Sequence, residues 1–267
     1  MAIKLSVAGA AGRMGGLILD LALKDNRFEV VSALEQASHP AADKPLKDVL
    51  PSAPGSIPVL SDVRKALSNA KVLIDFTLPQ ATREHLKAAR ETGTALVIGT
   101  TGIDGKGKEA IAEAARDIPV VFSPNMSVGM NLLFVLVEEA ARKLGMAYDV
   151  EIVEAHHKMK KDAPSGSALR LGESVAKAWG RDLKAISVHG REGLTGERQQ
   201  GLIGFHAVRG GDIVGDHTVY FAGPGERLEL KHQAHTREAF ARGSLMAALF
   251  LGSAKPGLYT MQDVLRT

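Results

Sequence analysis

The sequence predicts an α/β protein with a doubly wound parallel sheet, followed by a second α+β domain with a mixed sheet. Three observations predict this fold class. Short apolar runs alternate with helix-like stretches over the first half of the chain, a glycine-rich turn follows the first of those runs, and strand-like runs without intervening helices appear later. Alternation indicates a parallel sheet covered by helices, and strands in direct succession indicate antiparallel pairing.

The elements of the first half follow in order. Strands are expected at residues 3–8, 28–34, 72–76, 95–99 and 120–122, and helices at 14–23, 80–90 and 104–116. Residues 36–58 are rich in Pro, Ala and Ser, and predict a long surface loop with little regular structure.

The texture changes after Val128. Residues 130–144 predict a long amphipathic helix, 150–155 a strand and 168–179 a helix. Strands are then expected at 204–209, 213–221 and 227–232, with turn signals at 210–212 and 223–225, and these are expected to pair as consecutive antiparallel strands. Residues 237–251 return to a helix.

Composition limits the functions to consider. Of the 267 residues, 45% are hydrophobic and 24% charged, which is ordinary for a soluble globular protein. The net charge of +3 gives no reason to expect nucleic acid as a partner. The chain has no cysteine, which excludes disulfides, cysteine zinc sites and thiol catalysis. We see no signal peptide and no apolar run of membrane-spanning length, so we expect no membrane association and a cytoplasmic location.

The glycine turn is a candidate dinucleotide site. Gly9, Gly12 and Gly15 lie between the first strand and the first helix, where backbone N–H groups can face a pyrophosphate, as in Rossmann-type domains. Glu35 follows the second strand, where an acidic residue can accept hydrogen bonds from ribose hydroxyls. The alternatives are a tight turn without a ligand and an exposed loop glutamate. A carboxylate here should repel a 2′-phosphate, and Gln36 adds no positive charge, so NADH should serve at least as well as NADPH.

Two further loops are candidates for cofactor contacts. Gly99-Thr100-Thr101-Gly102 and Ser123-Pro124-Asn125-Met126-Ser127 follow the fourth and fifth strands. Ligands bind at the carboxyl ends of parallel strands. Taken alone, each loop is equally compatible with an ordinary connection.

The segment Glu154–Ser167 carries the chemistry. It holds adjacent histidines, three lysines and a Pro-Ser-Gly-Ser helix start, which together suit a small anion beside a proton donor. Strand alternation should send His156 and His157 to opposite sides, so we expect them to have different roles. The alternative is that both are surface residues among solvated lysines. No histidine shows a metal-ligand spacing with a carboxylate partner, so no metal is expected.

These motifs identify a resemblance. The chain resembles the 4-hydroxy-tetrahydrodipicolinate reductase family, also called dihydrodipicolinate reductase, over essentially its full length. The resemblance rests on Gly9–Gly15, Asp75-Phe76-Thr77, Gly99–Gly102, Glu154–Ser167, Arg191-Glu192-Gly193 with Thr195–Arg198, and Gly211–His217. The Glu-Ala-His-His and Asp-Ala-Pro-Ser-Gly segments are highly specific to this family.

The resemblance implies two domains and the residues of a site. Residues 1–127 and 237–267 would form the dinucleotide-binding domain, and 128–236 a substrate-binding domain that builds a homotetramer. His156 and Lys160 would be catalytic proton donors, and His157, Lys160, Gly166 and Ser167 would bind the carboxylates of a small dicarboxylate substrate. NADH or NADPH would contact Gly9, Ala10, Ala11, Gly12, Arg13, Met14, Glu35, Gln36, Gly99, Thr100, Thr101, Ser123, Pro124, Asn125 and Met126. The family often has Arg where this chain has Gln36, which weakens the case for NADPH.

The predicted function is NAD(P)H-dependent reduction of 4-hydroxy-tetrahydrodipicolinate to tetrahydrodipicolinate in lysine and diaminopimelate biosynthesis. Two alternatives remain at this point. One is another two-domain NAD(P)-dependent dehydrogenase, acting on an amino acid. The other is a non-catalytic dinucleotide sensor, which would need the glycine turn but neither His156 nor Lys160.

Overall fold

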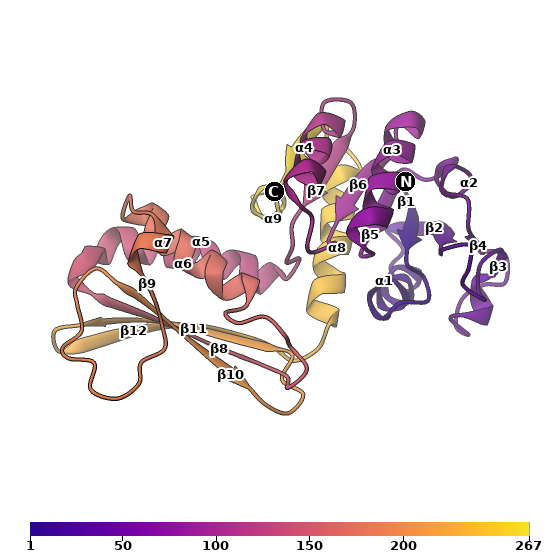
Figure 1. Cartoon of the computed structure of the whole chain (residues 1–267). Coiled ribbons are helices and arrows are strands. Elements are labelled where there is room, and N and C mark those ends of the chain that lie inside the picture. The colour runs from indigo at the N-terminus through magenta and orange to yellow at the C-terminus, as the bar shows by residue number, and fades with distance from the viewer. Residues whose placement is uncertain (267) are drawn as a thin grey trace. The chain divides into compact units, whose positions relative to one another are not determined.

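The computed structural model describes residues 1–266, which form two compact units (Figure 1). Unit 1 consists of Met1–Val128 together with the C-terminal stretch from Glu238, and unit 2 is Gly129–Arg237. The α/β fold class is confirmed, because one sheet is predominantly parallel and the other is mixed.

Unit 1 is built on an eight-stranded sheet, sheet A, in the order β13-β7-β6-β5-β1-β2-β4-β3. Its strands are β1 (Ile3–Ala8), β2 (Phe28–Leu34), β3 (Lys44–Pro45), β4 (Pro58–Leu60), β5 (Val72–Asp75), β6 (Ala95–Ile98), β7 (Pro119–Phe122) and β13 (Gly257–Tyr259). All neighbours pair in parallel except β3 and β4. The strand order reverses direction beside β1, and open α/β sheets bind ligands at such a switch point.

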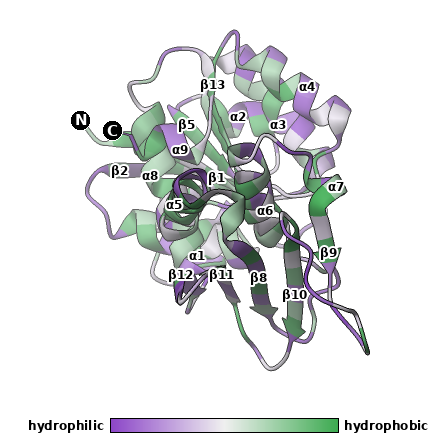
Figure 2. Cartoon of the chain, turned by 90° about the vertical axis from the view of Figure 1, so that its left-hand side faces the viewer, coloured by the Kyte–Doolittle hydropathy of each residue, from purple (hydrophilic) through white to green (hydrophobic). Residues whose placement is uncertain are grey.

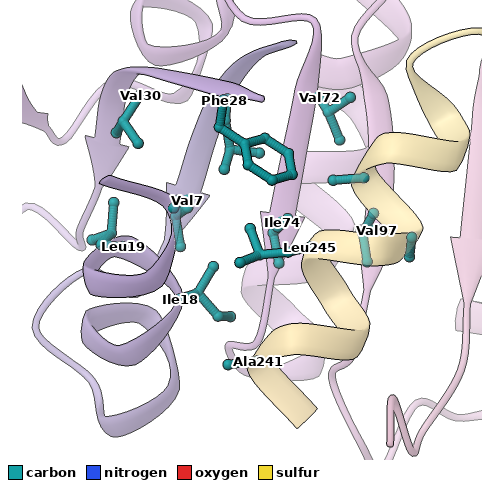
Figure 3. Packing of buried hydrophobic residues seen from close by; sticks show 14 of the residues in the cluster. Val7, Ile18, Leu19, Phe28, Val30, Val72, Ile74, Val97, Ala241 and Leu245 are labelled. Carbon is teal, nitrogen blue, oxygen red and sulfur yellow. The ribbon is translucent and has the colours of Figure 1, made fainter. Parts of the chain in front are cut away.

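Helices cover both faces of sheet A. They are α1 (Arg13–Leu23), α2 (Val63–Leu67), α3 (Pro79–Thr92), α4 (Gly105–Ala114), α8 (Glu238–Leu251) and α9 (Met261–Val264). Alternate residues of β5 illustrate the two cores: Val72 and Ile74 pack with α1 and α8, as Figure 3 shows, and Leu73 packs on the opposite side near α3 and α4. In Figure 2, α3 and α4 show hydrophobic and hydrophilic residues along their length, as amphipathic surface helices do.

Unit 2 is built on a five-stranded sheet, sheet B, in the order β12-β11-β8-β10-β9. Its strands are β8 (Asp149–His156), β9 (Ser187–His189), β10 (Ile203–Arg209), β11 (Gly215–Gly223) and β12 (Glu226–Ala234). Its helices are α5 (Val128–Leu144), α6 (Gly166–Ala178) and α7 (Leu183–Ile186). One face of the sheet packs against α5 and α6, through residues such as Ile152, Phe205 and Phe221 (Figure 1).

One expectation from the sequence was wrong, and a second was incomplete. Strands β10 and β11 do not pair with each other, because β8 lies between them; β10 runs parallel to β8 and β9, and the antiparallel hairpin is β11 with β12. Residues 36–58 have little regular structure, as expected, but they are not only a surface loop. They contain β3 and a 3₁₀ turn at Leu46–Asp48, and Leu46, Ala53 and Ile57 are buried in the core of unit 1.

Candidate active site

The glycine turn after β1 is tight and brings the backbone close to the start of α1. Gly9 adopts a positive φ of 72°, and its carbonyl oxygen accepts a hydrogen bond of 2.9 Å from the N–H of Gly12. A Cβ on Gly15 would lie 2.0 Å from that same oxygen, so no other residue fits there without moving the turn. The first turn of α1 therefore packs directly against the glycine turn. Arg13 and Met14 are the first residues of this helix, and its N-terminal N–H groups suit an anion.

Glu35 lies against this turn. One carboxylate oxygen accepts a hydrogen bond from the N–H of Ala11 at 3.1 Å, and the other accepts from the N–H of Gln36 at 3.0 Å. The carboxylate that was assigned to the ribose from its sequence position is thus adjacent to the predicted pyrophosphate turn. Ala10 contributes only its backbone, because its side chain is fully buried in the core.

The loop after β6 is held by a buried polar network. Thr100 is 2% exposed, and its hydroxyl contacts Thr82, the N–H of Thr77 and Asp75. Asp75 is fully buried, and its second carboxylate oxygen lies 2.9 Å from Nδ1 of His85. Burial opposes ionisation of Asp75, but the contact with His85 and the threonine hydroxyls outweigh it and hold the pKa of this carboxyl below its usual value.

This network was not predicted from the sequence. The available signal was a polar residue, Asp75, that ends an otherwise apolar strand. The network fixes the start of the loop Gly99–Gly102 beside the glycine turn, since a Cβ on Gly9 would lie 3.2 Å from the methyl group of Thr77. Thr101 of the same loop is exposed.

The loop after β7 divides its side chains between solvent and core. The hydroxyl of Ser123 donates to the carbonyl oxygen of Asn125 at 2.7 Å, and the side-chain oxygen of Asn125 accepts from the N–H of Ser127. Pro124 is exposed, whereas the side chain of Met126 is buried in the core. Any contact that Met126 makes with a cofactor is therefore through its backbone.

The predicted catalytic and substrate residues all lie in unit 2, around the end of β8. Residues 150 and 152 of this strand are apolar and face α5 and α6, and Glu154 and His156 continue on the same face. Register places Arg209 of β10 beside His156, and His217 of β11 beside Glu154. The apolar face of sheet B therefore ends in a cluster of titratable groups.

Glu154 lies at the centre of this cluster and is 1% exposed. Its carboxylate accepts two hydrogen bonds from Arg209, of 2.8 and 2.7 Å, and one of 3.0 Å from the N–H of Ser165. It also lies 2.6 Å from Nδ1 of His156. Burial opposes ionisation, but Arg209, His156 and Ser165 outweigh it and keep the pKa of Glu154 below its usual value.

The two histidines of the cluster differ in environment. Their ring centroids are 5.2 Å apart, and the rings meet edge to face. Burial and the neighbouring His156 lower the pKa of His217 to about 4, so His217 is neutral at pH 7. Burial also lowers the pKa of His156, whereas Glu154 opposes this change. A proton donor at neutral pH is therefore better sought in His156 than in His217.

The helix start beside the cluster is well defined. Ser165 caps α6, because its hydroxyl accepts a hydrogen bond of 3.1 Å from the N–H of Ala168. Gly166 and Ser167 are the first two helical residues. A Cβ added to Gly166 would meet no atom within 4 Å, so the space at this side of the first helical residue is open.

Lys160 and His157 complete the predicted residues. The ammonium group of Lys160 lies 2.9 Å from the carboxylate of Asp162, and its charge contributes to lowering the pKa of His156. His157 is half-buried, and its N–H donates to the carbonyl oxygen of Ile213 at 2.8 Å. The buried pattern of β8 ends at His156, so the two histidines differ in position as the alternation predicted.

Glu154, Arg209 and His217 were not among the residues predicted from the sequence to have a role. Glu154 was recognised only as part of a motif, and its inward position follows from the alternation of β8. Arg209 and His217 come from strands whose pairing partners were not predictable. Within residues 1–266, no group of three His, Asp or Glu side chains is placed to hold a metal ion, and no helix is both long and apolar enough to cross a membrane.

Comparison with known proteins gives matches over nearly the whole chain. A family model described as dihydrodipicolinate reductase, N-terminus, matches residues 3–126, and one described as dihydrodipicolinate reductase, C-terminus, matches residues 129–265. A 4-hydroxy-tetrahydrodipicolinate reductase of Dechloromonas aromatica (strain RCB) is 53% identical over 264 residues, which cover 99% of this chain and 98% of the relative. One of Aromatoleum aromaticum is 50% identical, covering 98% and 95%.

Solved structures agree on the fold. A dipicolinate-bound dihydrodipicolinate reductase from Paenisporosarcina sp. TG-14 superposes with a TM-score of 0.78 and 23% identity, covering 98% of this chain and 99% of that one. An amine dehydrogenase from Mycobacterium smegmatis reaches 0.63 with 12% identity, covering 98% and 95%. At these identities the structures support the two-unit architecture and nothing finer.

Proposed function

The chain belongs to the dihydrodipicolinate reductase family, and from this premise we propose which of its residues carry the reaction. It catalyses the NAD(P)H-dependent reduction of 4-hydroxy-tetrahydrodipicolinate, a step of lysine and diaminopimelate biosynthesis. Family membership decides against the amino-acid dehydrogenase and the dinucleotide sensor. We propose that unit 1 binds the dinucleotide and that unit 2 holds the substrate.

The observation that carries the proposal is the cluster at the end of β8, where titratable side chains meet the N-terminus of α6. The substrate is a small dicarboxylate. Its carboxylates would be held by the ammonium group of Lys160, the imidazole of His157 and the N–H groups of Gly166 and Ser167. The open space at the Cβ position of Gly166 leaves room for a ligand beside this residue.

His156 is the proposed proton donor, and Lys160 the second. A bound nicotinamide would supply the hydride. The substrate must also lose its hydroxyl group as water, and the enamine that hydride addition leaves must gain a proton on carbon. The Nδ1 atom of His156 is engaged by Glu154, and its Nε2 atom lies 3.1 Å from where a Cβ on Gly215 would stand. The missing side chain leaves room at Nε2 for the group to be protonated.

The proposed cofactor contacts come from three loops at the carboxyl edge of sheet A. The turn Gly9–Met14 would face the pyrophosphate, and Glu35 and Gln36 the adenosine ribose. The other parts of the dinucleotide would contact Gly99–Thr101 and Ser123–Met126. Because Gln36 brings no positive charge beside the Glu35 carboxylate, we expect NADH to be used at least as well as NADPH.

We also propose a cytoplasmic homotetramer assembled through unit 2. The face of sheet B away from α5 and α6 carries Glu151, His206, Val208 and Tyr220, and Val208 is 49% exposed. A sheet face without covering helices is suited to pairing with another copy of the chain.

The test of the catalytic assignment is a coupled assay, in which the upstream synthase supplies the substrate and nicotinamide absorbance reports turnover with either cofactor. His156→Ala should lower kcat by roughly 10²–10⁴-fold, the contribution of general acid catalysis. Lys160→Ala should lower kcat and raise KM, because it removes both a proton and a charge. Lys158→Ala, which removes an exposed lysine of the same segment, is the matched control and should behave as wild type. Normal turnover in both test variants would overturn the assignment.

A further inference from the structure

Glu154 joins three elements through one carboxylate. Arg209 reaches it from β10, the N–H of Ser165 from the start of α6, and His156 from two residues along β8. At 1% exposure it makes all of these contacts away from solvent. A buried carboxylate with one guanidinium partner remains ionised, because the bidentate pair offsets the cost of burying its charge.

An ionised carboxylate only accepts hydrogen bonds. The Nδ1 atom of His156, 2.6 Å away, must therefore carry the hydrogen that it donates to Glu154. This fixes the tautomer of the neutral ring and leaves Nε2 as the nitrogen that exchanges a proton. Gly215 faces Nε2, and its lack of a side chain keeps that position open.

We propose that Glu154 is a positioning residue for the reduction: it orients the His156 ring with Nε2 free and stabilises its protonated form, while Arg209 keeps Glu154 charged. This inference depends on the proposed role of His156 as proton donor. Glu154 itself would not touch the substrate.

The charges around His156 predict in which direction its pKa should move in each variant. Burial is the largest cause of its lowered pKa, the charges of Lys160 and Arg209 act in the same direction, and Glu154 acts against them. His217, from β11, is neutral at pH 7 and adds no charge. Removing the Glu154 charge should therefore lower the pKa of His156 further, and removing the Arg209 charge should raise it.

Two matched variants, Glu154→Gln and Arg209→Gln, test these opposite shifts in the pKa of His156. Both variants break the same Glu154–Arg209 pair. In Glu154→Gln, kcat should fall by roughly 10–100-fold, as when the orienting partner of a histidine is lost, with KM changed by less than about 3-fold. The pKa of His156, measured by NMR titration of isotope-labelled histidine, should move down in Glu154→Gln and up in Arg209→Gln. A purely structural role predicts similar losses in both variants and no opposite shifts.

Failure of this inference can be told apart from failure of the proposed function. If His156→Ala turns over normally, His156 is not the donor, and both ideas fall. If His156→Ala is slow, Glu154→Gln added to it should cause no further loss, because Glu154 acts through His156. The inference, but not the proposed function, would be overturned if Glu154→Gln lowered kcat as much in His156→Ala as in wild type. An unchanged pKa of His156 in Glu154→Gln would overturn it as well.

Thermal shifts with NADH and with pyridine-2,6-dicarboxylate establish that each variant is folded and binds. If Glu154→Gln does not fold, Glu154→Asp replaces it, because the shorter side chain keeps the charge but cannot hold the His156 ring in the same place. It should lower kcat in the wild-type background and cause no further loss in His156→Ala, and an equal loss in both backgrounds overturns the inference.

Discussion

Glu151 shows how much one side chain depends on its surroundings. It lies on the face of sheet B opposite to Glu154, where Arg191, Arg198 and His206 all contact its carboxylate at 2.7–3.0 Å. Burial opposes ionisation, but these partners outweigh it and lower the pKa of Glu151 to about 2. Two glutamates of one strand, three residues apart, thus serve two unrelated polar clusters.

The lowered pKa predicts a pH dependence of stability. A carboxyl whose pKa is lower in the folded state stabilises the fold above its unfolded pKa, and this contribution is lost as pH falls through the folded pKa. Glu151→Gln should therefore reduce the free energy of unfolding at pH 7 by about 1–3 kcal/mol, allowing for partial solvent screening. It should also flatten the loss of stability between about pH 5 and 2.

Urea unfolding at a series of pH values measures both effects. Glu91→Gln is the matched control, because Glu91 forms an exposed pair with Arg64. Such a pair contributes little to stability. If the two variants lost the same free energy of unfolding, the Glu151 cluster would contribute no more to stability than an exposed ion pair.

At the scale of the element, the start of α6 connects fold to function. This helix start follows β8 in the chain, and Ser165 is its N-cap residue. The carboxylate of Glu154 accepts a hydrogen bond from the N–H of Ser165. The N-terminal groups that remain exposed at Gly166 are those proposed to bind a carboxylate.

Gly166→Val should weaken dicarboxylate binding without destabilising the helix. The Cβ enters open space, so the fold has no reason to change, but the side chain blocks the N–H groups. Loss of one or two hydrogen bonds to a charged group corresponds to roughly 10–100-fold in affinity. Calorimetric titration with pyridine-2,6-dicarboxylate measures it.

Gly105→Val is the control for this substitution, because Gly105 is the first residue of α4 and also has open space at its Cβ. Its melting temperature should change as that of Gly166→Val does, with dicarboxylate affinity retained. Unchanged affinity in Gly166→Val would remove this helix start from the substrate site.

The elements also show what the sequence can and cannot predict. Alternation along β8 placed His156 and His157 on different sides, and the Pro-Ser-Gly signal located the start of α6, because both depend on local geometry. The partners of β10 and β11 were not predictable, since strand pairing is a long-range choice. For the same reason Arg209 and His217 were missed: no local pattern distinguishes them from surface residues. Three-residue strands such as β9 and β13 are too short to give a periodic signal.

At the scale of the whole molecule, sheet B presents the face proposed for assembly. Val208→Glu would place a charge at an exposed apolar position of this face, and burial of that charge between copies would be costly. Wild type should have about four times the chain mass of 28.3 kDa, and the variant should form smaller species.

Light scattering after size-exclusion chromatography measures these masses. Leu258→Glu is the control, because Leu258 is an exposed apolar residue on β13 in unit 1 and is 47% exposed. It should leave the mass unchanged. A Val208→Glu protein with wild-type mass would show that this part of sheet B is not an interface.

Unit 1 is closed by residues from both ends of the chain: α8 packs into its core, and β13 adds a strand beside β7. A ribosome synthesises the chain from the N-terminus, and domains fold as their residues emerge. Unit 2 is one continuous stretch and so has all its residues while unit 1 still lacks α8 and β13. The dinucleotide-binding unit is therefore the first to be started and the last to be finished. A nascent chain that stops before Glu238 would carry all of unit 2, together with a sheet whose core face is covered by α1 but not by α8.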